Sequence, residues 1–147
     1  MSAVGVSYND KFLVFGGWLR RYASYSDVWA FSFITKSWRQ LHVKGENLPS
    51  LAGASATLMS NNEILIFGGV YQYLNGTPIF YNSLYTFDPS NNFISIKTPV
   101  SASPPPREMH IAVSNGDDLY GSIWQRRPEI RGSDIVNIYL LIAFSFS

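Results

Sequence analysis

Two matching stretches decide the fold of this chain: Phe12-Leu-Val-Phe-Gly16-Gly17 and Ile64-Leu-Ile-Phe-Gly68-Gly69. Each is a short apolar segment that ends in two glycines. Such a pair is typical of a strand end where the backbone takes positive φ or lies close to a neighbouring chain segment. Because the same pattern returns after about fifty residues, the sequence predicts a tandem array of similar units. The expected units are antiparallel β modules.

Turn residues and apolar runs divide each unit into four strands. In the first unit we expect strands over residues 2–8, 11–15, 25–33 and 38–43. In the second unit we expect them over residues 52–59, 63–67, 82–88 and 93–97, with a long loop over 70–81. Four antiparallel strands in about fifty residues match the size of one propeller blade.

Aromatic residues also recur in order. Trp29 and Tyr85 lie in the third strand of their units, and Trp38 and Phe93 lie in the fourth. Large rings in a blade have the neighbouring blade to pack against. We therefore expect Trp29, Trp38 and Tyr85 to be buried, and we align Phe93 with Trp38.

A third unit begins at Pro105 and loses its pattern after Tyr120, where another diglycine is due. We therefore predict a repeat region over residues 1–120, followed by a divergent tail, 121–147, whose structure the sequence does not predict. Within the repeat region, blade one spans 2–44, blade two spans 50–98, and blade three starts over 105–120. A closed propeller needs at least four blades, so this chain cannot close a ring alone. We favour a fragment or truncated product of a longer protein; assembly of several chains and an open array are the alternatives.

The pattern resembles the kelch repeat. The resemblance rests on the diglycine strands, on the ordered aromatics, and on the Pro-Pro-x-x-x-His lead-in from Pro105 to His110. It implies an all-β, kelch-type partial β-propeller made of four-stranded antiparallel blades, acting as a non-catalytic protein-interaction module. Since similar propellers occur in the galactose oxidase superfamily, a remnant of such an enzyme is an alternative, as is a truncated product without its own function.

Composition argues against most catalytic sites. The chain has no cysteine and only two histidines, His42 and His110, which occupy non-equivalent positions in different units. A redox metal site needs clustered His, Cys or carboxylate ligands, so we predict no metal, no cofactor and no enzymatic activity. The seryl and aspartyl residues, Ser55 among them, suggest no Ser-His-Asp arrangement.

Charge and hydropathy limit the partners. Among 147 residues 46% are hydrophobic, 14% are charged and the formal net charge is +1, which leaves no electrostatic footprint for nucleic acid or an anionic membrane. The apolar run 138–146 is shorter than a membrane-spanning helix requires. The absence of cysteine fits a reducing compartment, and we expect a cytoplasmic location.

The segments that follow the two diglycines are the candidate binding surface for a protein partner. Trp, Tyr and Arg are enriched at interface hot spots, and both segments contain such residues. The predicted binding residues are Trp18, Arg20, Arg21, Tyr22, Tyr71, Tyr73 and Phe80. Because an incomplete ring leaves strand edges unpaired, self-association through open blade edges is a further expectation.

Overall fold

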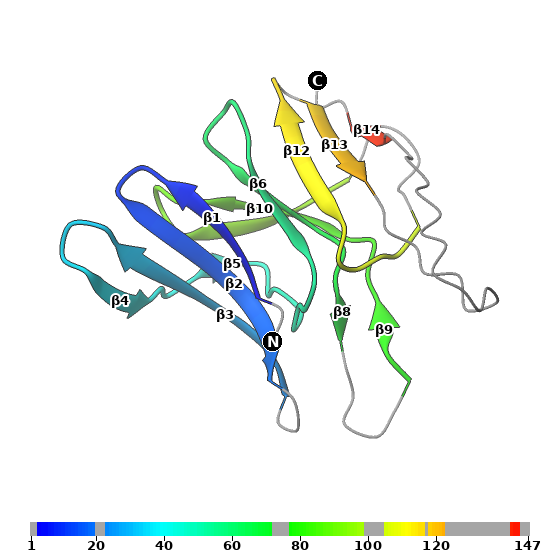
Figure 1. Ribbon diagram of the computed structural model, residues 1–147, viewed down its shortest axis with the longest axis horizontal. Helices are drawn as coiled ribbons and strands as arrows, with labels where there is room; N and C mark the ends of the chain where they lie inside the picture. The colour runs from blue at the N-terminus through cyan, green and yellow to red at the C-terminus, as the bar shows by residue number, and fades with distance from the viewer. Residues whose placement is uncertain are drawn as a thin grey trace, which may run out of the picture.

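The computed structural model describes residues 3–19, 23–71, 77–98, 105–116, 118–122 and 142–144. Every regular element in these ranges is a β-strand (Figure 1). The strands form three larger sheets and one two-stranded hairpin. This arrangement confirms the predicted all-β fold built of antiparallel blades. Within the described ranges, the chain has no helix that could cross a membrane.

Blade one is a four-stranded antiparallel meander in the order β1-β2-β3-β4. Its strands are Val4–Tyr8 (β1), Lys11–Leu19 (β2), Ala23–Ser32 (β3) and Ser37–Gln40 (β4). The turn between β1 and β2 has Asn9 at a φ of 51°, a conformation that Asn tolerates better than most residues.

Blade two has the order β5-β11-β10-β7-β6. Its antiparallel strands are Ser55–Leu58 (β6), Ile64–Phe67 (β7), Leu84–Asp88 (β10) and Phe93–Lys97 (β11). The fifth strand, Lys44–Gly45 (β5), follows blade one in the chain and pairs parallel to β11. The segment that leaves blade one is thereby tied to the outer edge of blade two.

Blade three contains Ile111–Asn115 (β12), Asp118–Ser122 (β13) and Ile142–Phe144 (β14). All neighbouring strands in this sheet are antiparallel, and β14 pairs with β13 at Leu119, Tyr120 and Gly121. Residues near the end of the chain therefore supply the third strand of this blade. Composition alone did not predict this pairing.

Two expectations about the segments after the diglycines were wrong. Strand β2 does not end at Gly16-Gly17 but continues to Leu19, with a shift of register against β3 between Phe15 and Gly17. A glycine at positive φ, here Gly16 at 55°, lets the strand absorb this bulge and continue. The loop expected over 70–81 contains a short hairpin of Val70–Tyr71 (β8) and Ile79–Phe80 (β9).

The alignment of Phe93 with Trp38 was also wrong. Trp38 pairs with Phe31 across β3 and β4, whereas the corresponding partner of Phe87 across β10 and β11 is Ile94. Ile94 therefore occupies the position of Trp38 in the repeat, and Phe93 precedes it by one residue. A shift of one residue in a strand moves a side chain to the opposite face of the sheet. Ile94 is accordingly buried, while Phe93 is exposed.

Each blade has two faces, which we name by the neighbouring blade that they meet. The forward face points toward the following blade and the rear face toward the preceding one. The first core joins the forward face of blade one to the rear face of blade two, and Phe15 meets Phe87 there edge to face at 5.3 Å between ring centroids. The principal residues of this core are Leu13, Phe15, Val28 and Ala30 from blade one, with Ile64, Ile66, Tyr85, Phe87 and Ile94 from blade two.

The second core joins blade two to blade three. Leu65, Phe67 and Leu84 on the forward face of blade two pack with Leu119 of blade three. Side chains alternate along β7, so that Ile64 and Ile66 serve the first core and Leu65 and Phe67 serve the second. Blade two is thus covered on both faces, which is why all four residues of β7 are buried.

The expected burial of Trp38 was wrong as well. Tyr85 is buried, but Trp29 is only half-buried, and the Trp38 side chain is 53% exposed and contacts Phe31 at 5.2 Å between ring centroids. Trp38 lies on the rear face of blade one, and no preceding blade covers that face in the described part of the chain. The position of the blade in the array therefore decides the exposure of this ring.

Candidate functional site

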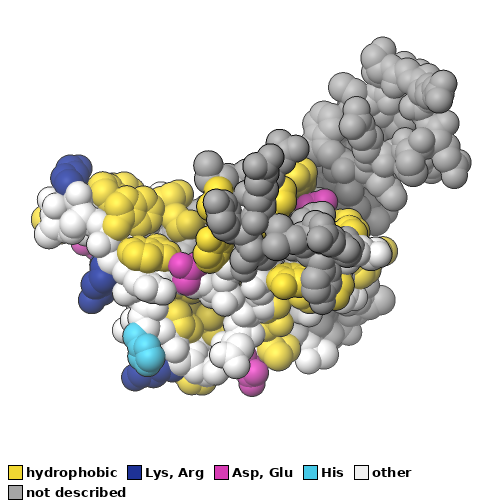
Figure 2. All heavy atoms as spheres, turned by 90° about the horizontal axis from the view of Figure 1, so that it is seen from below, with side chains coloured by type: hydrophobic (Ala, Val, Ile, Leu, Met, Phe, Trp, Pro, Cys, Tyr) yellow, Lys and Arg dark blue, Asp and Glu magenta, His cyan; other side chains and the backbone are white. Residues whose placement is uncertain are grey.

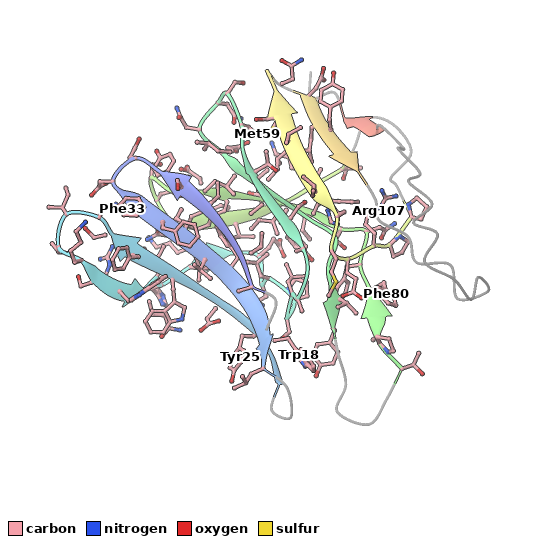
Figure 3. The ribbon with its side chains drawn as sticks, in the orientation of Figure 1. Trp18, Tyr25, Phe33, Met59, Phe80 and Arg107 are labelled. Atoms are coloured by element: carbon pink, nitrogen blue, oxygen red, sulfur yellow. The ribbon has the colours of Figure 1, made fainter. Side chains whose placement is uncertain are left out.

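The segments that follow the two diglycines extend from the same end of the molecule. In Figure 1 the far end of the β2–β3 pair and the β8–β9 hairpin both point to the lower edge of the view. Trp18 and Tyr25 lie at this end of blade one, and Phe80 lies on the hairpin of blade two (Figure 3). Neighbouring blades therefore present these segments together on one side.

Three of the predicted binding residues are described. Trp18 is half-buried near the end of β2, opposite Ser24, and Tyr71 is half-buried in β8, opposite Ile79. Phe80 is exposed in β9, with 43% of its surface open to solvent. The other four predicted residues, Arg20, Arg21, Tyr22 and Tyr73, lie outside the described residues.

Sequence reasoning missed two exposed residues at this end. Tyr25 is 43% exposed at the start of β3, and Ile79 is 44% exposed beside Phe80 in β9. Neither was predicted as a binding residue, because Tyr25 lies in an expected strand rather than a loop, and Ile79 is aliphatic and not of the hot-spot type. We call Trp18, Tyr25, Ile79 and Phe80 the loop-end surface. Figure 2, viewed from this end, shows hydrophobic side chains at the surface with few charged groups among them.

The diglycines fix the blades that carry this surface. The Gly17 amide donates to the Leu51 carbonyl at 2.7 Å, and the Gly69 amide donates to the Arg107 carbonyl at the same distance. In both places the diglycine of one blade binds the segment that leads into the next blade. Leu51 and Arg107 therefore hold equivalent positions in the segments that lead into blades two and three.

A buried polar pair lies between blades two and three. The Ser55 hydroxyl lies 2.8 Å from Nε2 of His110. Both residues are buried, and His110 also meets the Phe67 ring edge to face at 5.4 Å between centroids. Nδ1 of His110 has no hydrogen-bond partner among the described residues. The sequence alone did not indicate this pairing, because Ser55 and His110 belong to different units.

Burial controls the charge of this pair. Removal from water lowers the pKa of His110 from 6.5 to about 4, and the positive charge of Arg107 contributes to the shift. Burial also lowers the pKa of Arg107, whose guanidinium lies over the Phe67 ring at 5.9 Å and donates from Nε to the Pro105 carbonyl. Burial raises the pKa of the adjacent Glu108. The His110 ring is therefore neutral at neutral pH in the interface between the blades.

A serine beside a histidine is also the minimal arrangement of a nucleophile and its base. Here Ser55 is only 6% exposed and faces the neighbouring blade, so a substrate has no path to its hydroxyl. A histidine with a pKa of about 4 is, moreover, a weak base at neutral pH. The geometry suits a hydrogen bond that holds two blades together.

The His110 pair predicts a loss of stability in acid. An unfolded chain binds a proton on His110 below about pH 6.5, whereas the folded chain resists protonation down to about pH 4. The contribution of His110 to the free energy of unfolding is therefore complete above about pH 6.5 and is lost as the pH falls toward 4. In an NMR titration we expect the His110 ring resonances to show a midpoint near pH 4.

A variant at His110 distinguishes the pH dependence of stability that comes from this residue from the pH dependence that comes from the carboxylates. In His110→Gln, the fall in the free energy of unfolding between about pH 6.5 and pH 4 should be smaller than in the wild-type chain. A ring that titrates near pH 6.5, or an unchanged pH dependence in the variant, would contradict this assignment.

Over the ranges that the structure describes, no three His or carboxylate side chains gather in a way that could hold a metal ion.

Two comparisons relate the chain to known proteins. A family model described as the KLHDC2/KLHL20/DRC7 Kelch-repeats domain matches residues 2–122. The chain is also similar to the solved structure titled "Structure of YjhT", with a TM-score of 0.66 and 20% sequence identity. That match covers 82% of this chain and 43% of the other, so this chain spans less than half of the other chain's length. At this identity the structural likeness concerns the fold alone. Because the family model covers most of the sequence and reaches from blade one to the second strand of blade three, the chain belongs to the kelch-repeat family.

Proposed function

We propose that this chain is a non-catalytic protein-interaction module that binds a protein partner through its loop-end surface. Kelch domains generally mediate contacts between proteins, which supports the class of function. The observation that carries the proposal is the exposure of Tyr25, Ile79 and Phe80 at the end where two adjacent blades extend their loops. Loops on a rigid β scaffold are common sites of recognition.

The residue types favour a protein as the ligand. Rigid aromatic side chains supply contact area at low cost in conformational entropy, and a contact that mixes aromatic and aliphatic groups is typical of an interface core. The predicted residues Arg20 and Arg21 follow Trp18 in the chain and would add paired hydrogen bonds to a carboxylate of the partner. We therefore propose a partner with an apolar patch that carries an acidic group.

Replacing two aromatic side chains of the loop-end surface, the half-buried Trp18 and the exposed Phe80, should weaken binding without unfolding the chain. We expect the double variant Trp18→Ala/Phe80→Ala to bind its partner at least about tenfold more weakly, because each truncated hot-spot ring typically costs 1 kcal/mol or more. A partner recovered with the full chain as bait is the ligand, and isothermal titration calorimetry measures the affinity.

The control is Phe93→Ala. Phe93 has the same exposed fraction as Phe80, 43%, but lies at the opposite end of blade two, next to the turn between β10 and β11. The Phe93→Ala variant should therefore bind the partner with unchanged affinity. Wild-type affinity in a folded Trp18→Ala/Phe80→Ala variant, or an equal loss in Phe93→Ala, would argue against the loop-end surface.

The proposal extends to the origin and location of the chain. We propose that it is a shortened product of a longer kelch protein, because the repeat signal stops after Tyr120. We also propose a cytoplasmic location, because the chain has no cysteine, which fits a reducing compartment. Sequencing of transcripts across the Tyr120 codon tests the first part. A longer in-frame kelch continuation in other transcripts would support it, and its absence from every transcript would contradict it.

A further inference from the structure

No described residue covers two apolar sheet faces that lie at opposite flanks of the blade array. Blade one forms one flank in Figure 1 and blade three forms the other, with blade two between them. On the rear face of blade one, Trp38 is 53% exposed and contacts the Phe31 ring. Phe33, which follows β3 (Figure 3), meets the same Phe31 ring edge to face and is 41% exposed. On the forward face of blade three, Ile111 is 59% exposed and Val113 is 56% exposed.

The repeat shows what normally covers such positions. Register places Ile94 at the position of Trp38, and Ile94 is 1% exposed because blade one packs on it. Likewise β6 of blade two corresponds to β12 of blade three, so Ser55 and Thr57 correspond to Ile111 and Val113. Ser55 and Thr57 are 6% and 8% exposed, and both hydrogen-bond to blade three.

The two uncovered faces are a matching pair. Among the described residues there are two contacts between blades, and in each a forward face meets a rear face. The uncovered pair consists of one rear face and one forward face, and both are mainly apolar. Each has one carboxylate beside an aromatic residue: Asp27 accepts a hydrogen bond from the Trp29 indole, and Asp118 accepts one from the Tyr120 hydroxyl. The apolar residues of the two faces are Phe12, Val14, Trp29, Phe31 and Trp38 on blade one, with Ile111, Val113 and Tyr120 on blade three.

We propose that a second copy of this chain covers these faces, with blade three of one copy packed on blade one of the other. The contact has the same form as the two contacts inside the chain. Two copies joined head to tail at both flanks would bring together six sheets of the blade type, three from each chain. Six lies within the range of four to eight blades found in closed propellers. A contact between two different surfaces closes into a ring only when the rotation fits. A closed two-chain ring therefore requires the three blades of each copy to span half a turn.

The oligomeric state of the full chain tests the proposal. In analytical ultracentrifugation we expect the wild-type chain to sediment at about twice its protomer mass of 16.5 kDa. Trp38→Glu on one face and Val113→Glu on the other should each break the two-chain ring, because a charge at the centre of an apolar contact is costly. The matched control is Ile34→Glu: Ile34 is 75% exposed in the turn after β3, off both faces, and the variant should associate like the wild type.

A mixing experiment identifies the head-to-tail geometry. The Trp38→Glu chain keeps an intact blade-three face, and the Val113→Glu chain keeps an intact blade-one face. Mixed in equal amounts, the two variants should form a one-to-one complex that each forms only weakly alone. Circular dichroism verifies that both variants keep their β-sheet signal, and Ile111→Glu replaces Val113→Glu if the latter fails to fold.

Each other outcome overturns the proposal. Association that survives both substitutions would place the contact elsewhere. Loss in Trp38→Glu alone, with no complex on mixing, would show that two blade-one faces pair with each other. A monomeric wild-type chain would leave the faces to blades of another polypeptide. The outcome is independent of the proposed function, because Trp18→Ala/Phe80→Ala leaves both faces intact.

Discussion

Replacing Phe87 by Ala should lower the free energy of unfolding by about 3–5 kcal/mol, the usual cost of removing a buried aromatic side chain. The Phe87 ring is 0% exposed, lies in the core between blades one and two, and meets Phe15 edge to face at 5.3 Å between centroids. Its removal opens a cavity where two blades join, so both blades should be destabilised together. Denaturation by urea, followed by circular dichroism, measures the change.

Trp38→Ala provides the contrast. Trp38 is the larger side chain, and sequence reasoning expected it to be a core residue, yet 53% of its surface is exposed. We expect a loss of less than about 1 kcal/mol, since substitutions of exposed side chains have small effects. The comparison is made at the lowest usable protein concentration, where a second copy does not cover the ring. Equal losses in the two variants would show that the rear face of blade one is covered within a single chain.

Adding a single methyl group at Gly68 should be nearly as costly. Gly68 has a φ of +69°, and a Cβ atom there would lie 2.7 Å from the Arg107 carbonyl oxygen. An alanine carries a backbone cost of about 1–2 kcal/mol in this conformation. It would also displace the segment that leads into blade three and so disturb the hydrogen bond from Gly69 to Arg107. We expect Gly68→Ala to lower the free energy of unfolding by about 2–4 kcal/mol.

Gly116→Ala is the matched control for backbone strain. Gly116 has a similar φ of +64°, but a Cβ atom there would meet nothing within 4 Å. This variant should show the backbone cost alone, about 1–2 kcal/mol, in the same urea denaturation. The difference between the two glycines then measures the close approach of the lead-in segment to the diglycine. If the two losses are equal, that contact contributes nothing to stability.

Local pattern was enough to predict the four principal antiparallel strands of blade one and of blade two. The apolar run that ends at Phe67 is a strand in the structure, and the turn at Asn9 lies where the sequence indicates. The diglycines take positive φ and bind a neighbouring segment closely, as their residue type predicts. These features depend on residues near in sequence, or on the absence of a Cβ atom, so they can be inferred without knowledge of the neighbours. The candidate site was harder to predict from the sequence. The loop residues were predicted from composition, whereas Tyr25 and Ile79 could be recognised only from their exposure in the structure.

The sequence by itself determined the all-β fold, the kelch repeat and the order of the four principal strands in blades one and two, because the repeat period and the apolar runs can be read directly from it. Only the tertiary structure decided which faces of the blades are covered. Trp38 and Ile94 hold equivalent positions, yet Trp38 is 53% exposed and Ile94 is 1% exposed. Ser55 likewise pairs with His110, which belongs to a separate repeat unit. The physical reason is that burial depends on which sheet packs against a face, and that neighbour comes from a distant part of the chain or, as we propose here, from a second copy.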